Sequence, residues 1–138
     1  MSRLILRTAQ LQDFAAESTN ELRRCRVIAQ FSGLVESRDN PTPTTLQFRD
    51  LKQLSEHEPG PPIYMVIGDS LYCSKFLNNY NERPIEGDVL DMRCCVVQGT
   101  IEIMHFRVLA LKELNAITQF LNSDEGHLFL NMSGRAAS

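Results

Sequence analysis

Five short apolar stretches, separated by segments rich in proline, glycine and asparagine, constrain the fold of this chain more than any other feature. The stretches begin at Thr44, Ile63, Leu71, Val89 and Ile101. Runs of this length, enriched in β-branched and aromatic residues and bounded by turn residues, are typical of β-strands. We therefore expect one all-β domain in which five strands close into a barrel, because closure leaves no exposed sheet edge.

The last two stretches carry the plainest strand pattern. Every second residue from Leu90 to Val96 is apolar, which indicates a strand over Val89 to Val97 with one buried face. Gln98-Gly99 predicts a tight turn, and Ile101 to Leu111 predicts the following strand. The apolar residues of that strand change phase near Met104, so we expect a bulge there.

The middle of the chain predicts a hairpin between polar loops, the firmest hairpin in the sequence. Ile63 to Ile67 and Leu71 to Leu77 are apolar runs, and Gly68-Asp69-Ser70 between them is a turn sequence. Thr44 to Leu54 predicts the strand before this hairpin. Turn residues predict loops at 37–45 and 55–62 and a short helical turn within 78–86.

The N-terminal residues follow helical spacing more closely than alternation. Apolar residues from Thr8 to Phe31 favour two short helices, with a break and an N-cap at residues 18–20. The alternative is a strand over Cys25 to Glu36, in which Gly33 marks a bulge.

The C-terminal region predicts an amphipathic helix over Leu114 to Leu121. Its apolar face consists of Leu114, Ile117, Phe120 and Leu121. This face either docks on another protein or covers the barrel of its own chain. We expect the residues after Ser123 to form a short docked segment and then a disordered end. The expected organisation is a partly helical extension (1–21), the barrel with its C-terminal helix (22–122) and a tail (123–138).

Composition narrows the range of functions. Fourteen basic and 17 acidic residues give a net charge of −3, which argues against a protein that coats nucleic acid through bulk charge. Any contact with DNA is then local. The longest apolar runs are too short for a membrane span or a secretory signal, so we expect a soluble intracellular protein.

Residues with metal-binding or catalytic potential occur in no recognisable arrangement. The four cysteines are Cys25, Cys73, Cys94 and Cys95, and none forms a CxxC pair, so we expect reduced and mostly buried thiols. The three histidines lack ligand partners at metal-binding spacing, and no nucleophile or phosphate-loop motif occurs. The sequence predicts no metal, no cofactor and no enzyme.

Five strands with a helix between the third and the fourth are the order of an OB barrel. The run TTLQFRDLKQLSEHEPGPPIYMVIGDSLYCSKFL resembles the N-terminal OB domain of the large subunit of replication protein A. The resemblance extends over residues 22–114 and places LRRCRVIAQF at the first helix of that family. Lys52 matches a basic groove position, whereas Ile63, Met65 and residues 98–100 replace basic residues of that family.

That resemblance implies a nuclear, non-catalytic OB module that recruits or holds other proteins at single-stranded DNA during replication, repair or telomere maintenance. Direct binding of a single strand on the barrel face is the alternative, and a dimerising barrel is a third hypothesis. OB barrels bind single strands by stacking bases on aromatic side chains and by tracking phosphates with basic ones. The residues predicted to line a nucleic-acid or partner groove are Arg49, Lys52, Tyr64, Tyr72, Lys75, Arg93 and Arg107.

Among these groove residues, we expect Tyr72 to be the best exposed aromatic. Alternation within their strands predicts that Arg93 and Arg107 point outward. For every aromatic in the chain, packing in the core is the competing role, because only seven Phe and three Tyr serve the whole domain.

Overall fold

A computed structural model describes residues 3–17, 20–35, 44–52, 60–78 and 83–135. The strands are β1 (Arg3–Ile5), β2 (Arg23–Val35), β3 (Thr44–Arg49), β4 (Ile63–Ile67), β5 (Val89–Val97) and β6 (Thr100–Val108). The helices are α1 (Thr8–Ala16), α2 (Asp69–Tyr72) with its π-helical continuation η2 (Cys73–Leu77), α3 (Leu111–Leu121) and α4 (Asp124–Arg135).

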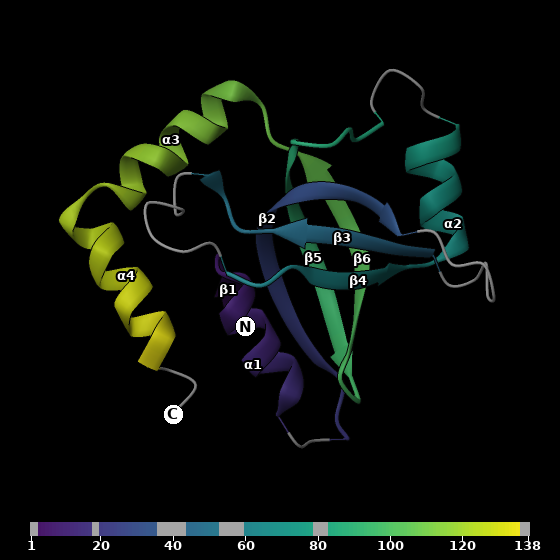
Figure 1. Ribbon diagram of the computed structural model, residues 1–138, viewed down its shortest axis with the longest axis horizontal. Coiled ribbons are helices and arrows are strands. Elements are labelled where there is room, and N and C mark those ends of the chain that lie inside the picture. Colours follow the sequence, from purple (N-terminus) through teal and green to yellow (C-terminus); the bar gives the residue numbers. More distant parts are fainter. Residues whose placement is uncertain (1–2, 18–19, 36–43, 53–59, 79–82, 136–138) are drawn as a thin grey trace.

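Strands β2 to β6 form a closed five-stranded barrel, which confirms the expected OB fold (Figure 1). Their order is β2-β3-β4-β6-β5, and β5 pairs back with β2. The β4–β6 pair is parallel, and the other pairs in the barrel are antiparallel. β1 adds a short sixth strand parallel to β2.

β2 closes the barrel because it is long enough to pair with two neighbours. Its first part, through Gln30, pairs with β5, and its last part pairs with β3. The β2–β3 register shifts between Phe31 and Gly33, where Gly33 has a φ of 131°. Positive φ is accessible to glycine at little steric cost. The bulge at Gly33 that the alternative N-terminal interpretation proposed is confirmed.

The second of the two predicted N-terminal helices is wrong, and the alternative strand is right. α1 is the only helix between residues 3 and 35 that the structure describes, and Arg23–Val35 is β2. The inward residues of β2 alternate as in any strand, but the outward Ile28 is also buried, at 5% exposure, beneath the C-terminal helix region. Because β2 has apolar residues on both of its faces, the spacing of these residues in the sequence is close to that of a helix.

The predicted strand at Leu71–Leu77 is also wrong, because these residues belong to α2 and η2. The amide of Tyr72 donates to the carbonyl of Gly68 at 2.9 Å and closes the first helical turn. Asp69 lies in that turn, where a negative charge suits the helix dipole. Gly68-Asp69-Ser70 therefore starts a helix and does not turn a hairpin.

The barrel keeps five strands because β2 replaces the mispredicted one. A helix does lie between the third and fourth barrel strands, as predicted, but it comes before residues 78–86, where the sequence placed it. Residues 83–85 have no helical structure, and residues 79–82 lie outside the described residues. β3 ends at Arg49, earlier than the predicted end at Leu54.

The hairpin of β5 and β6 follows the sequence closely. Arg93 pairs with His105 and Cys94 with Ile103, which leaves Met104 as the expected bulge. Gln98 and Gly99 both have a positive φ, of 50° and 80° respectively. A two-residue hairpin turn requires positive φ at both residues if it is to match the twist of the strands.

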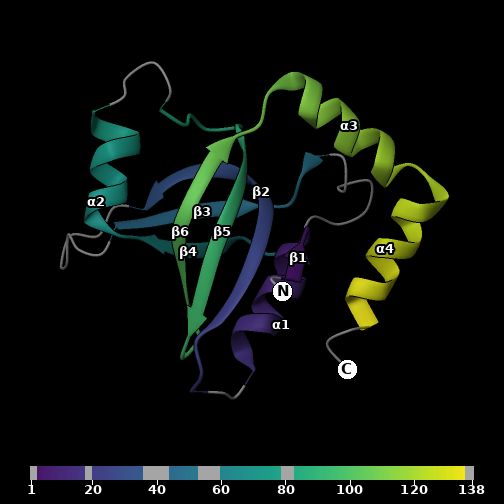
Figure 2. The same cartoon turned by 180° about the vertical axis from the view of Figure 1, so that it is seen from behind.

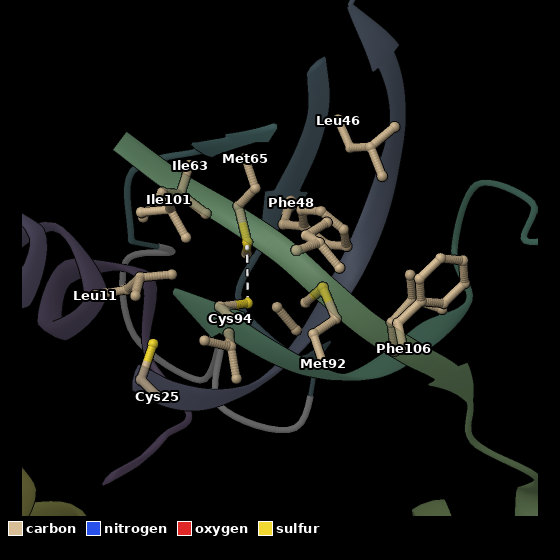
Figure 3. Close-up of a cluster of buried hydrophobic side chains, with 14 of the residues drawn as sticks. Leu11, Cys25, Leu46, Phe48, Ile63, Met65, Met92, Cys94, Ile101 and Phe106 are labelled. Carbon is tan, nitrogen blue, oxygen red and sulfur yellow. Dashed lines mark hydrogen bonds between the residues drawn. The ribbon is translucent and has the colours of Figure 1, made fainter. Parts of the chain in front are cut away.

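The inner core fills the barrel with side chains from all five of its strands. Figure 3 shows Met65 and Cys94 facing each other inside it, and the Cys94 thiol donates to the Met65 sulfur at 4.0 Å. A hydrogen bond with Cys25 and burial both raise the pKa of Cys94, so this thiol stays protonated. Cys25 and Cys94 are buried, Cys95 is half-buried and Cys73 is exposed; all four are free.

α1 covers one end of the inner core through Leu11 and Phe14. The backbone amide of Thr8, at the start of this helix, donates to the carboxylate of Asp50 at 2.7 Å. The amide of Gly60 donates to the same carboxylate at 3.0 Å. Asp50 therefore ties the start of α1 to the end of β3, although 42 residues separate it from Thr8.

A second apolar cluster, here called the outer cluster, lies outside the barrel wall. Its buried members are Leu6, Ile28, Leu51, Val89, Leu109 and Leu121, and Leu4, Leu114, Ile117 and Phe129 pack against them. We call α3 and α4 together the C-terminal arm. The arm leaves the end of β6 on the side of the barrel remote from α2 (Figures 1 and 2). Among the described residues, no helix is long and apolar enough to cross a bilayer.

Candidate functional site

The structure divides the predicted groove residues among several parts of the barrel. Arg49 and Tyr64 lie on β3 and β4, Lys52 follows the end of β3, and Tyr72 and Lys75 lie on α2 and η2. Arg93 and Arg107 lie on β5 and β6, which pass behind β3 and β4 in Figure 1. Arg49 and Tyr64 lie on one pair of neighbouring strands and Arg93 and Arg107 on another, while Tyr72 and Lys75 lie on the helix.

The outward side of β3 and β4, here called the β3–β4 face, presents one aromatic and one basic side chain. Tyr64 is 52% exposed, and its register partner on β3 is Gln47. Arg49 lies two residues further along the same face and is exposed. A pocket of about 320 Å³ borders Tyr64 and separates β4 from the end of α1. The pairing of an open aromatic ring with an arginine suits a stacked base and its phosphate.

Tyr72 and Lys75 are less available than expected. The Tyr72 ring stacks on Phe76 at a centroid distance of 5.2 Å and packs against the inner core. The Lys75 ammonium lies 6.0 Å from the centre of the Phe106 ring. The prediction that Tyr72 is the best exposed aromatic is wrong, because the helix turns it onto the barrel and Tyr64 is the open ring.

The outward side of β2, β5 and β6, here called the arginine face, carries a connected set of charges. Arg26 donates two hydrogen bonds to Asp91, at 2.8 and 2.7 Å. Arg107 lies 3.5 Å from Asp91 and 2.6 Å from Glu113 of α3. The amide of Ala110 donates to Glu113 at 3.2 Å, which caps the start of α3. This network joins the barrel wall to the arm.

The network also fixes the charge states of its members. The hydrogen bonds from Arg26 lower the pKa of Asp91, although burial acts in the opposite direction. The hydrogen bond from Arg107, followed by that from the Ala110 amide, lowers the pKa of Glu113. Both carboxylates are therefore ionised at neutral pH. The outward orientation predicted for Arg93 and Arg107 is confirmed, and Arg107 is largely committed to holding α3.

Sequence reasoning did not select Arg24, Arg26, Asp91 or Glu113 for any site. Arg24 and Arg26 were assigned to a helix, which scatters them around its axis. The strand β2 places them on one face, two residues apart. The signal was the alternation of Cys25, Val27 and Ala29 with polar residues, but the buried Ile28 obscured it.

Three of the four predicted helix-interface residues pack within the chain. Leu114, Ile117 and Leu121 contribute to the outer cluster, so α3 covers part of its own barrel. Phe120 is 41% exposed, and its ring lies 5.9 Å from that of Phe129 on α4. α4 extends the expected short segment after Ser123 into a helix of 12 residues.

The turn between α3 and α4 is built by two small residues. The Ser123 hydroxyl donates to the Phe120 carbonyl at 2.5 Å and accepts from the Gly126 amide at 3.0 Å. A Cβ atom on Gly126 would overlap the Phe120 carbonyl oxygen, so a glycine is required there. The arm still exposes Leu111 (73%), Phe120 and Leu128 (61%).

No protein-family model matches the chain, and no curated protein matches it. Among solved structures, it is similar to a chain in the crystal structure of yeast Stn1 and Ten1, with a TM-score of 0.74 and 29% sequence identity. The match covers 91% of this chain and 94% of that chain, so it includes additions to the barrel as well as the barrel itself. The chain is therefore an OB-fold protein whose architecture is similar, over most of its length, to that of a chain in the Stn1 and Ten1 structure.

Proposed function

We propose that this protein is a non-catalytic OB module of a DNA replication, repair or telomere-maintenance complex, and that it acts in the nucleus mainly by binding another subunit at single-stranded DNA. The observation that carries this proposal is the C-terminal arm. Its helices leave Leu111, Phe120 and Leu128 exposed, although the arm already has an apolar cluster available to it. Exposed apolar residues on one short arm are typical of a surface that a partner covers.

The comparison supports the same function. The similar chain comes from a crystal structure that contains two different proteins, yeast Stn1 and Ten1. The sequence resemblance to the large subunit of replication protein A supports the recruitment of partners at single-stranded DNA. The net charge of −3 agrees with a module whose main contacts are with protein.

Two adjacent substitutions test the arm. Phe120→Asp places a charge in the exposed apolar surface, whereas Gln119→Asp adds the same charge at an exposed polar position on the same helix. Each chain is tagged at its genomic locus, purified from nuclear extract and analysed by mass spectrometry. We expect wild type and Gln119→Asp to retain an OB-fold subunit of a DNA-maintenance complex, and Phe120→Asp to lose it. Recovery of no such protein with wild type contradicts the proposal.

A self-associating barrel gives a different result in the same variants. Sedimentation velocity of the purified chains shows whether wild type forms dimers that Phe120→Asp dissociates, because a buried unpaired charge opposes association. We expect monomers for wild type and for both variants. A wild-type dimer that this substitution dissociates replaces the heteromeric proposal with the structural one.

Direct binding of single-stranded nucleic acid on the β3–β4 face is the second candidate function, and the exposed Tyr64 beside Arg49 favours it. We expect Tyr64→Ala to weaken binding of a fluorescent oligothymidine by about tenfold, because stacking one base contributes about 1–3 kcal/mol. Tyr72→Ala is the comparison, since its ring already stacks on Phe76. The absence of wild-type binding at low salt excludes this function.

A further inference from the structure

The arginine face contains a pocket that neither the arm nor the β3–β4 face accounts for. The pocket has a volume of about 290 Å³ and lies across the three strands β2, β5 and β6. Its lining residues are Arg24, Cys25, Arg93, Cys94, Cys95, Met104 and His105. The strands β5 and β6 lie in front of β3 and β4 in Figure 2, so the pocket opens on the opposite side of the barrel from Tyr64.

The strand register places the basic side chains of this pocket side by side. Arg93 on β5 pairs with Arg26 on β2 and with His105 on β6. Arg24 pairs with Cys95, so it lies two register rows from Arg93, diagonally across β2 and β5 on the same outward face. Adjacent strands are about 4.8 Å apart. The basic groups of Arg24, Arg93 and His105 are therefore within reach of one small ligand.

Arg24 and Arg93 differ from the other arginines of this face in forming no ion pair with the described residues. Arg26 and Arg107 are held by Asp91 and Glu113. Among the residues that the structure describes, no ion pair involves Arg24 or Arg93, and both are exposed. The charge of Arg93 helps to lower the pKa of Asp91, but neither guanidinium group is in direct contact with a carboxylate of the described part of the chain, so both can bind an anion from outside the chain.

The chemistry of the lining indicates which anion. Guanidinium groups bind phosphate oxygens in a bidentate manner. Met104, which is 54% exposed, and the half-buried Cys95 add apolar surface to the lining. A volume of about 290 Å³ is at the lower end of the range for small-ligand pockets, roughly 300–1,000 Å³, which suits one nucleotide rather than a folded peptide segment.

We infer that this pocket holds one nucleotide of a single-stranded nucleic acid, with Arg24 and Arg93 on the phosphates that flank it. The inference rests on the second candidate function, direct binding of a single strand, and adds a contact on the opposite side of the barrel. A nucleic-acid strand that contacts both faces must pass around the barrel and extend beyond the β3–β4 face.

The salt dependence of oligothymidine binding tests the inference, because it counts phosphate contacts. Arg24→Ala and Arg93→Ala are each expected to weaken binding by about fivefold. For single strands the slope of log K against log salt changes by about 0.7 for each phosphate contact, so the double variant should lose about 1.4. Arg93→Lys keeps the charge and is expected to keep most of the slope while it weakens binding.

Lys112→Ala is the matched control, because it removes one exposed positive charge on α3. Far-ultraviolet circular dichroism establishes that each variant keeps the wild-type fold. If Arg24→Ala and Arg93→Ala behave like Lys112→Ala while wild type binds and Tyr64→Ala weakens binding, the pocket inference is wrong and direct binding stands. If wild type binds no oligothymidine, both are wrong. Binding of a phosphoserine peptide is titrated in the same way. If the arginine substitutions weaken binding of this peptide but not of oligothymidine, the pocket binds a different ligand and the inference is wrong.

Discussion

The inner core and the C-terminal arm are held by different kinds of interaction. The inner core is enclosed by five hydrogen-bonded strands, and Leu46, Phe48 and Met65 within it are 0% exposed. The arm is attached by one side of α3, by Phe129 of α4 and by the ion pair of Arg107 with Glu113. The core therefore determines whether the chain folds, and the arm determines what the folded chain presents to a partner.

The largest expected effect comes from opening the inner core. Phe48→Ala removes a ring that packs 5.7 Å from Phe31 and should lower the free energy of unfolding by about 3–5 kcal/mol. Leu121→Ala in the outer cluster should cost about 2 kcal/mol, because the arm can shift to fill the space. Urea titrations followed by circular dichroism measure both. Equal costs at the two sites would remove the distinction between core and arm.

The next effect lies at the junction of the two regions. Asp91→Asn removes the charge that Arg26 and Arg107 share, and should lower the free energy of unfolding by about 1–2 kcal/mol at pH 7. The pKa of Asp91 is lowered in the folded protein, so its contribution is complete above the ordinary aspartate pKa of about 3.9 and is lost as pH falls through the folded value.

Urea titrations at pH 7 and pH 3 check this sign. The difference between wild type and Asp91→Asn should shrink at the lower pH, because wild type begins to lose the contribution that the variant lacks. Asp13→Asn, an exposed position on α1, is the control. A difference that stays constant from pH 7 to pH 3 contradicts the role given to the ionised carboxylate.

A third change should affect the arm and spare the barrel. Gly126→Ala places a Cβ against the Phe120 carbonyl and should open the turn between α3 and α4. We expect less than about 1 kcal/mol of change in the unfolding of the barrel, but faster amide hydrogen exchange in residues 111–135. Gln119→Ala, on the exposed side of α3, is the control. Unchanged exchange in the arm shows that the turn tolerates a side chain.

The smallest effect is a gain of stability in the β5–β6 turn. Gln98 has a φ of 50°. Residues other than glycine, asparagine and aspartate adopt such a positive φ at an energetic cost. Gln98→Asn supplies the Asn-Gly pair that this turn prefers, and should raise the free energy of unfolding by about 0.5 kcal/mol. Thermal unfolding of the two proteins measures it, and a loss of stability contradicts the turn type.

The elements that could be predicted from sequence were those in which local pattern and tertiary environment agree. β5 alternates because its inner residues meet the core and most of its outer residues meet water or other polar groups. β2, α2 and η2 were mispredicted because a neighbour changed the environment. The arm buries Ile28 on the outer side of β2, and the barrel receives Tyr72 from α2 and Phe76 from η2. A single-sequence pattern cannot show which outward side chain another element will cover.

Some features of the candidate sites could likewise be predicted from local pattern, and others depend on tertiary structure. Outward orientation of Arg93 and Arg107 followed from alternation alone, since side chains of a strand point to opposite faces in turn. The pairing of Arg24 with Cys95, and of Arg107 with Glu113, depends on strand order around the barrel and on where α3 starts. These relations join residues that are far apart in the chain.

By itself, the sequence determined the strands β3 to β6, the turn at Gln98-Gly99, the bulge at Met104 and an amphipathic helix after the last strand. Each of these depends on neighbours a few residues away, where periodicity and turn chemistry act directly. Tertiary structure alone decided that β2 closes the barrel, that Asp91 links the wall to the arm, and that Arg24 and Arg93 share a pocket. These depend on contacts between distant segments, which form only when the chain buries its apolar surface as a whole.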